Sequence, residues 1–218
     1  MNLPTAQKYA TDILNWLQPT WLRCEITGSI RRQRPSPNDV DLCLIPKETI
    51  YQDLLGHVTG RQNHTWMFLK SYVNNFPART LKSGQRHPAI LTGGDSPGHR
   101  MTLQLPSCQL DLWFADESNW SSKLIQSTGS KEHNIWLAQR AADKGLHWFV
   151  SQGLARLDAL DHQGIQVAIH DAPRRARAAH LILPALDETE FYKYLDLAWI
   201  EPQNRELPWL QKHIDSGL

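Results

Sequence analysis

The amino-acid sequence predicts an α/β (α+β) protein in which helices flank a sheet. Three observations favour this fold class: a helical repeat of apolar residues near the start, several short β-prone stretches after it, and a second helical region beyond residue 118. The chain has 218 residues, of which 41% are hydrophobic and 9% aromatic, so it can bury a core as one large domain or two small ones.

The first expected element is an amphipathic helix. Apolar side chains recur at helical spacing between Tyr9 and Leu17, and the preceding stretch Leu3-Pro4-Thr5 suits a helix start. The dipeptide Gln18-Pro19 ends the pattern, because proline disfavours helical backbone in the residue before it. We therefore expect one helix at the start of the chain.

Strands follow this helix. Residues 24–27 and 40–45 are apolar and β-prone, and the second stretch stops at a proline, so we expect two strands of one sheet. A helix is predicted at 48–58. Residues 61–98 are rich in Gly, Pro and Asn with weak periodicity, so they are expected to be loops with one or two short elements.

A hairpin is expected in the middle of the chain. Residues 101–105 and 109–114 both have strand character, and Pro106-Ser107 between them is typical of a turn. The two strands should pair, with Asp111 on the second.

Two helices and a second hairpin are expected after residue 118. The helical pattern starts at Asn119, breaks at Thr128-Gly129, and resumes after Ser130, a good N-cap, until Gly145. Two further β-prone stretches flank a turn-like segment, at residues 153–160 and 165–169.

The charges nearly cancel. The chain has 23 Lys and Arg against 22 Asp and Glu, a formal net charge of +1, so it lacks the basic field of a processive nucleic-acid binder, and any DNA affinity must come from a local patch. The three cysteines form no CxxC pair, which disfavours a disulfide framework and a zinc ribbon. No apolar run approaches the roughly 20 residues of a membrane span, and the start does not resemble a signal peptide, so we expect a cytoplasmic protein.

Two carboxylates stand side by side on an expected strand. Asp39 and Asp41 are two positions apart, and alternate residues of a strand point to the same face. Two acids so close repel unless a cation neutralises them, and hard oxygen ligands suit Mg²⁺. Solvated surface alternation also produces an isolated Asp-x-Asp, but here it follows Gly-Ser and two arginines within 14 residues, counting Gly28 through Asp41.

The surrounding residues complete a pattern suited to phosphoryl transfer. Asp111 is flanked by apolar residues on another expected strand, so three carboxylates could converge on two metal ions. The turn at Gly28 lets the backbone approach a phosphate closely, Ser29 adds a hydroxyl donor, and Arg32 adds a guanidinium that can bind phosphate oxygens in bidentate fashion.

Three stretches together resemble a known family. GSIRRQRPSPNDVDL, with 11 positions from Gly28 to Asp39, is similar to the nucleotidyltransferase signature of the family X (DNA polymerase β-like) polymerases. LIQSTGSKEHN and LDLAWIEPQNRE resemble the family's thumb motif and C-terminal motif. The resemblance covers most of the chain outside residues 62–99. It implies a palm at residues 1–117, with a mixed sheet flanked by helices, and a small α/β thumb at residues 118–218.

The resemblance also implies roles for the three acids. Asp39 and Asp41 would bind both of two Mg²⁺ ions, for which Mn²⁺ can substitute. Asp111 would bind the catalytic ion and accept the proton of the primer hydroxyl. The expected substrates are a dNTP (or NTP) and primer-template or gapped DNA, and we expect a monomer that fills short gaps distributively, as in DNA repair.

Further roles are implied for the nucleotide. Gly28, Ser29 and Arg32 would hold the triphosphate, with Arg32 facing solvent in the free protein. Asn134 would meet the minor-groove edge of the incoming base, and Thr128-Gly129 would bend over its sugar. The neighbouring Arg31 is expected to serve internal ion pairing. For His133, which lies beside Asn134, a surface or packing role is expected rather than a role in the active site, and Trp113 is expected to be a core residue rather than a base-stacking platform.

Some residues depart from the family pattern and leave alternatives open. Relatives that repair DNA place an aromatic pair where this chain has Gln126 and Ser127, and commonly an Arg where it has Ala138. A template-independent or RNA-directed nucleotidyltransferase is therefore an alternative. A catalytically silent nucleic-acid-binding module is a second one, against which the three intact acids count.

A basic cluster lies in the expected thumb. Arg174, Arg175 and Arg177 could contact backbone phosphates of DNA, a contact that is independent of base sequence and weakens with salt. A solvated helix face is an equally good interpretation of the same residues.

Overall fold

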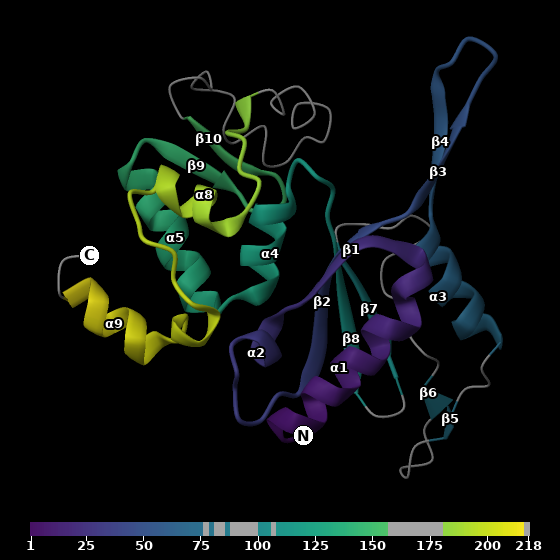
Figure 1. Cartoon of the computed structure of the whole chain (residues 1–218), viewed down its shortest axis with the longest axis horizontal. Helices are drawn as coiled ribbons and strands as arrows, with labels where there is room; N and C mark the ends of the chain where they lie inside the picture. The colour runs from purple at the N-terminus through teal and green to yellow at the C-terminus, as the bar shows by residue number, and fades with distance from the viewer. Residues whose placement is uncertain (76–78, 81–85, 88–99, 106–107, 157–180, 216–218) are drawn as a thin grey trace. The chain divides into compact units, whose positions relative to one another are not determined.

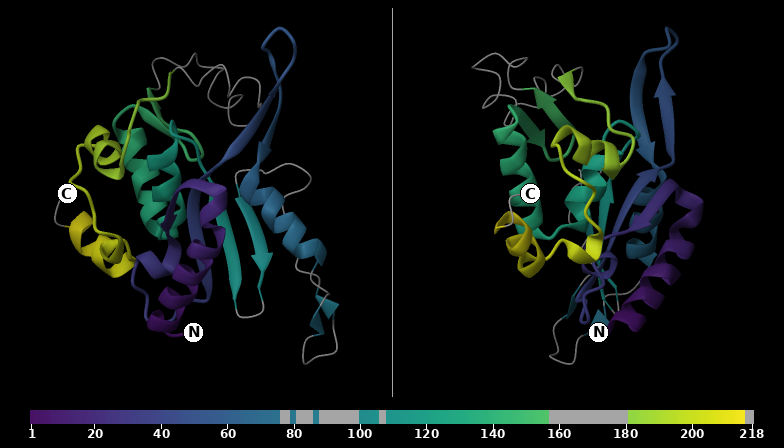
Figure 2. Two further views of the ribbon diagram at one scale, coloured as in Figure 1. Left: turned by 45° about the vertical axis from the view of Figure 1, so that its right-hand side comes forward. Right: turned by 60° about the vertical axis from the view of Figure 1, so that its left-hand side comes forward.

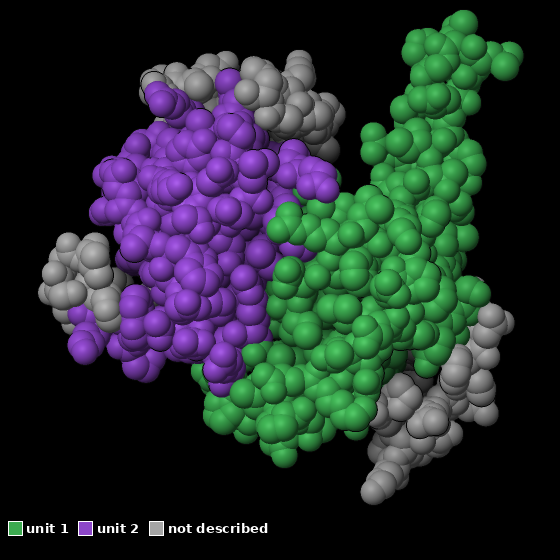
Figure 3. Space-filling model, viewed as in Figure 1, with its two compact units in different colours: residues 1–30, 34–116 green, residues 31–33, 117–218 purple. Residues whose placement is uncertain are grey.

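The computed structural model describes residues 1–75, 79–80, 86–87, 100–105, 108–156 and 181–215 (Figure 1). It divides into two compact units, coloured separately in Figure 3. Unit 1 consists of Met1–Ile30 and Arg34–Asp116, and unit 2 of Arg31–Gln33 and Glu117–Leu218. The short segment 31–33 therefore belongs to the second unit.

Unit 1 is built on a mixed four-stranded sheet. Its strands are β1 (Trp21–Ile26), β2 (Asp39–Pro46), β7 (Arg100–Gln104) and β8 (Gln109–Phe114), in the order β1-β2-β8-β7. The central pair β2 and β8 is parallel, whereas the β1–β2 and β7–β8 pairs are antiparallel. The predicted strands and the β7–β8 hairpin are confirmed, and so is the mixed α+β fold class.

Helices cover one face of this sheet (Figure 2). The first, α1 (Leu3–Leu17), begins where the Asn2 side chain accepts a hydrogen bond from the backbone of Thr5 at 3.0 Å, and it ends before a 3-10 turn, η1 (Gln18–Thr20). Alternate strand residues point at the helices and form the core of the unit, including Val40, Leu42, Leu44, Met101, Leu103, Leu110 and Leu112. The opposite positions of the central strands carry polar side chains such as Asp41 and Asp111, together with Cys43 and Trp113.

A β-hairpin replaces the helix predicted at 48–58. Strands β3 (Glu48–Gln52) and β4 (Val58–Asn63) pair antiparallel and extend away from the sheet (Figure 1). The turn between them is fixed by Asp53, whose side chain accepts hydrogen bonds from the backbone of Leu55 and His57, both at 2.9 Å. The helix prediction was wrong because the β-prone residues Thr49, Ile50 and Tyr51 and the turn at Asp53 favour a hairpin.

A second helix of unit 1 lies in the stretch expected to be mostly loops. It is α3 (His64–Asn75), and the side chain of Asn63 caps its start by accepting from the backbone of Trp66 at 2.9 Å. Trp66 and Leu69, one helical turn apart, are buried in the core of unit 1. Two short strands, β5 (Arg79–Thr80) and β6 (Arg86–His87), pair beyond it.

Unit 2 contains helices and a hairpin. The predicted pair of helices is confirmed as α4 (Trp120–Thr128) and α5 (Lys131–Asp143), and the Ser130 side chain caps the second by accepting from the backbone of His133 at 3.2 Å. Further along the chain come a short helix, α8 (Glu188–Tyr194), a 3-10 turn, η4 (Pro202–Asn204), and α9 (Leu207–Asp215). Their apolar side chains form a separate core.

The hairpin of unit 2 differs from the expected one. Strand β10 (Gly153–Arg156) pairs with β9 (Leu146–Phe149), which precedes it. The expected partner strand at 165–169 lies outside the described residues. Within the described part of the chain, no helix has the length and hydropathy to cross a membrane.

Candidate metal and nucleotide site

The three predicted acids lie on the polar face of the unit 1 sheet. Asp39 and Asp41 are on β2, and the parallel register sets Asp41 directly opposite Asp111 on β8. Residues aligned in neighbouring strands point to the same face, so this face, which we call the acid face, carries Asp39, Asp41 and Asp111. Their placement on two neighbouring strands agrees with the sequence.

Gly28 packs directly against Asp41. Its backbone has a φ of +61°, and a Cβ atom built there would lie 2.0 Å from Asp41 Oδ2. The backbone N–H of Thr27 also donates to the carbonyl of Asp41 at 2.9 Å. A side chain at position 28 would therefore displace the carboxylate of Asp41. This close contact explains why the position is a glycine.

The environment of Asp41 disfavours its charge. Burial raises the pKa of this carboxyl to about 7, an effect that Trp113 opposes and the neighbouring acids reinforce. Trp113 Nε1 donates to Asp41 Oδ1 at 3.2 Å. Trp113 is only half-buried, so its place on the acid face corrects the expectation of a core residue. A cation bound beside Asp41 would favour the ionised carboxylate.

Protein donors surround the third acid. Asp111 is 1% exposed, and its Oδ2 accepts from Arg100 Nη2 at 2.8 Å and from Gln109 Nε2 at 3.0 Å. Its Oδ1 accepts from the hydroxyl of Thr102. Sequence reasoning missed these three partners, although the strand alternation of Arg100 and Thr102 on β7 would have placed them on the same face as Asp111.

These contacts decide how a metal could fit. Among the residues that the structure describes, no group of three or more His, Cys, Asp or Glu side chains is arranged to hold a metal ion. Asp111 directs both of its carboxylate oxygens to protein donors. Asp39 and Asp41 remain a pair of hard oxygen ligands of the kind that Mg²⁺ binds.

A buried hydroxyl lies next to Gly28 in the chain. Ser29 Oγ is buried and has no hydrogen-bond partner within the described part of the structure. A buried hydroxyl usually finds a partner, so an unsatisfied one calls for an explanation such as a ligand. A phosphate oxygen would satisfy it, which fits the expected role of Ser29.

Arg32 does not face solvent, contrary to expectation. Its Nε donates to Glu206 Oε1 at 2.7 Å, its Nη1 donates to the carbonyl of Thr128, and its side chain is 15% exposed. Both partners belong to unit 2, and they replace water as neighbours of the guanidinium. A triphosphate could bind Arg32 only by taking it from Glu206, so this conformation argues against a freely available phosphate contact.

Arg31 has the internal ion pair expected for it. Its two terminal nitrogens donate to the two carboxylate oxygens of Glu188, at 2.9 and 2.8 Å. Glu188 also accepts from Arg205 Nη1 at 2.9 Å, and the side chain of Arg205 is fully buried. Burial alone would raise the pKa of Glu188, but the charges and hydrogen bonds of Arg205 and Arg31 lower it to about 2.

At the corner between α4 and α5, the polar side chains of Thr128 and Asn134 hydrogen-bond to other groups of the protein. Thr128 is fully buried, and its hydroxyl accepts from Arg31 Nη1 at 2.7 Å. Gly129 has a φ of +72°, and a Cβ there would lie 2.9 Å from Arg32 Nη1. Asn134 Nδ2 donates to the carbonyl of Gln126 at 3.0 Å, so its amide now serves the corner itself.

His133 has a packing role in the interior, not a surface position. It is fully buried, and its Nε2 lies 2.6 Å from the Tyr192 hydroxyl. Burial lowers its pKa to about 3, with a further contribution from the charge of Arg205. The expected DNA contacts Arg174, Arg175 and Arg177 lie outside the described residues.

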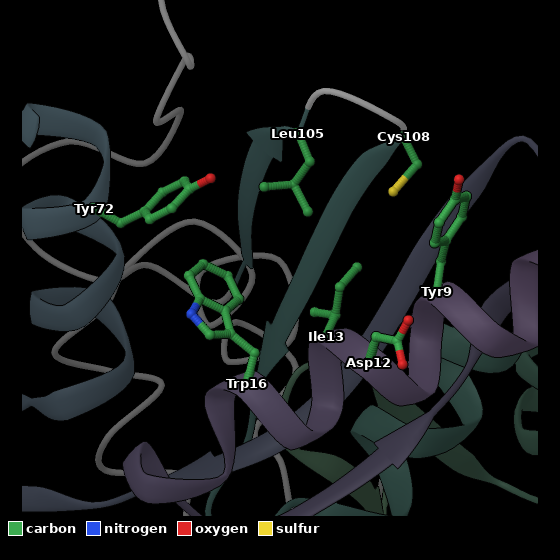
Figure 4. Close-up of a pocket in the computed structure, with 7 residues that line it drawn as sticks. All are labelled: Tyr9, Asp12, Ile13, Trp16, Tyr72, Leu105 and Cys108. Atoms are coloured by element: carbon green, nitrogen blue, oxygen red, sulfur yellow. The ribbon is translucent and has the colours of Figure 1, made fainter. Parts of the chain in front are cut away.

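A cavity of about 310 Å³ lies elsewhere in unit 1 (Figure 4). It is lined from α1, α3 and the β7–β8 turn by Tyr9, Asp12, Ile13, Trp16, Tyr72, Leu105 and Cys108. The lining is mostly apolar, and its one carboxylate pairs with Lys8 at 2.6 Å. Because no Lys or Arg is among these lining residues, the cavity does not suit a triphosphate.

Comparisons with known proteins found similarity in the second half of the sequence and in the fold. Residues 123–206 match the family model described as DNA polymerase beta thumb. No curated protein matches the sequence. The fold is similar to that of Leishmania infantum polymerase beta in a ternary P/T complex, with a TM-score of 0.63 and 17% identity over 95% of this chain and 77% of that one.

Proposed function

We propose that this chain is a divalent-metal-dependent nucleotidyltransferase of the family X DNA polymerase-like type, because residues 123–206 match the DNA polymerase beta thumb model and the fold is similar to that of polymerase beta. It adds dNTPs to the 3′-hydroxyl of a DNA primer and fills short gaps distributively. Unit 1 supplies the metal-binding acids, and unit 2 supplies groups that bind the nucleotide.

One observation carries this proposal: the register that aligns Asp41 with Asp111 and leaves Asp39 on the same face. Three acids on one face of a sheet are costly unless a cation balances them. The pKa of Asp41 is raised to about 7, mainly by burial and further by the charges of Asp39 and Asp111. Two divalent ions bound there would activate the attacking hydroxyl and stabilise the leaving pyrophosphate. Mg²⁺ is the expected ion, with Mn²⁺ as a substitute.

The residues of the chain then have separate tasks. Asp39 and Asp41 hold the metals, and Gly28 keeps the Asp41 carboxylate in place, since a Cβ would lie 2.0 Å from it. Ser29, whose buried hydroxyl has no partner among the described residues, donates to the triphosphate. Once its own donors release it, Asp111 would bind the catalytic ion and accept the proton of the primer hydroxyl.

Further contacts to the nucleotide come from residues of unit 2. Arg32 binds the triphosphate by exchanging Glu206 for a phosphate oxygen, because a guanidinium binds either anion in bidentate fashion. Thr128 and Gly129 form the bend at the sugar. Asn134 reaches the base after leaving the Gln126 carbonyl, which it now contacts at 3.0 Å.

Primer extension with a matrix of substrates tests the proposal. The full chain is incubated with Mg²⁺ or Mn²⁺, each labelled dNTP or NTP, and a primer that is templated by DNA, templated by RNA or untemplated. We expect metal-dependent extension with the dNTP that complements a DNA template. Extension without a template or on RNA would favour the alternative nucleotidyltransferases, and no extension in any combination would support a silent nucleic-acid-binding module.

A further inference from the structure

The guanidinium of Arg100 forms an ion pair with Asp111, the third acid of the acid face. Arg100 Nη2 lies 2.8 Å from Asp111 Oδ2, and their side chains are 47% and 1% exposed. A buried carboxylate is costly without a counter-charge. Among the described residues, Arg100 is the cation that hydrogen-bonds Asp111, so it supplies that counter-charge in the protein without metal.

The remaining donors to Asp111 are neutral. Thr102 donates to Oδ1, and Gln109 shares Oδ2 with Arg100 at 3.0 Å. A carboxylate accepts about four hydrogen bonds or metal bonds in all. Three donors leave about one of these positions for a metal ion, and an approaching cation repels the positive donor most.

Arg100 is also the donor that is best able to leave. It comes from β7, at the edge of the sheet, and about half of its side chain is in solvent. Its guanidinium lies over the Trp113 ring, 4.7 Å from the ring centroid, where a cation is attracted to the aromatic face. The Trp113 ring can hold the Arg100 guanidinium when another cation binds Asp111.

We propose that Arg100 competes with a divalent metal ion for Asp111 and so weakens metal binding at the acid face of the free protein. The inference rests on the proposed function, because it assumes that Asp39, Asp41 and Asp111 bind metal. Asp111 can bind the metal ion fully only after Arg100 has moved away from it.

The size of the effect follows from the exposure of the pair. A half-exposed ion pair contributes modestly, so its removal should tighten metal binding by about three- to tenfold rather than by orders of magnitude. The gain should require Asp111, because the competition takes place at that carboxylate.

Manganese binding to the full chain, measured by electron paramagnetic resonance of the free ion, tests the proposal without any reaction. The dissociation constant is compared for the wild type, Arg100→Gln and Arg61→Gln. Arg61 is a matched control, an exposed arginine of unit 1 that pairs with Glu48 at 3.2 Å on the hairpin. We expect tighter binding for Arg100→Gln and no change for Arg61→Gln. Arg100→Lys keeps the charge and guards against loss of fold; it should bind Mn²⁺ less tightly than Arg100→Gln.

The same comparison in an Asp111→Asn background locates the competition. There the gain from Arg100→Gln should vanish. Unchanged or weaker binding in Arg100→Gln, or a gain that persists without Asp111, would overturn the proposal while leaving the proposed function intact. No Mn²⁺ binding by any of these proteins would instead contradict the metal site on which the proposed function depends.

Discussion

The buried carboxylate of Glu188 provides the sharpest test of how unit 2 is held together. It accepts hydrogen bonds from Arg31 at 2.9 and 2.8 Å, from Arg205 at 2.9 Å and from Trp199 at 3.2 Å. The perturbation is Glu188→Gln, which keeps the shape and removes the charge. It leaves Arg205, which is fully buried, without its counter-ion.

The expected loss can be worked out in two ways. Removing one partner of a buried pair costs about 3–5 kcal/mol, because the other charge stays buried and uncompensated. The pKa of Glu188 falls from its ordinary 4.5 to about 2, and at ~1.4 kcal/mol per pH unit this corresponds to about 3–4 kcal/mol. We therefore expect unfolding free energy at pH 7 to fall by about 3–5 kcal/mol.

The direction of the Glu188 pKa shift determines how the stability loss in Glu188→Gln should depend on pH. The folded-state pKa of Glu188 is depressed, so its contribution is present above pH 4.5 and is lost as the pH falls toward 2. The difference between wild type and Glu188→Gln should shrink across that interval. Urea unfolding followed by tryptophan fluorescence measures it, with the exposed Glu201→Gln as control. A loss below about 1 kcal/mol at pH 7 would refute the reasoning.

Three further predictions concern the site and its surroundings. Glu206→Gln should tighten nucleotide binding about three- to tenfold, since Arg32 no longer has to leave an anionic partner; fluorescence titration with a labelled dNTP measures this, and weaker binding would contradict it. Gly28→Ala should weaken Mn²⁺ binding at least about tenfold, because the new Cβ would lie 2.0 Å from Asp41 Oδ2; an unchanged dissociation constant would tell against the close contact. Burial lowers the pKa of His133 to about 3, so the unfolded state binds more protons below pH 6.5, and stability should fall by about 2 kcal/mol from pH 7 to pH 5; His133→Gln should remove most of that slope.

The parts of the fold that the sequence predicted have strong local signals. The spacing of Asp39 and Asp41 follows from strand alternation, and the corner at Thr128-Gly129 follows from a glycine and a capping serine. Such signals lie in residues that are close together in the sequence, so they can be recognised without the tertiary structure.

The parts that the sequence could not predict depend on partners far along the chain. Arg32 pairs with Glu206 across 174 positions, and no periodicity in either segment indicates that contact. Arg100 and Asp111 are only 11 positions apart, but their contact depends on the register of the β7–β8 pair. The β3–β4 hairpin was missed for a different reason, because its turn rests on side-chain hydrogen bonds of Asp53.

The rate of a single nucleotide addition tests the central claim most directly. It is measured in a single turnover at saturating Mg²⁺, primer-template and nucleotide, for Asp39→Asn, Asp41→Asn and Asp111→Asn. The control is Glu25→Gln, an exposed acid on the neighbouring strand β1. We expect each aspartate variant to be at least about 1,000-fold slower than the wild type, with the control within about twofold. Aspartate variants that keep the wild-type rate would show that the chemistry does not take place at the acid face.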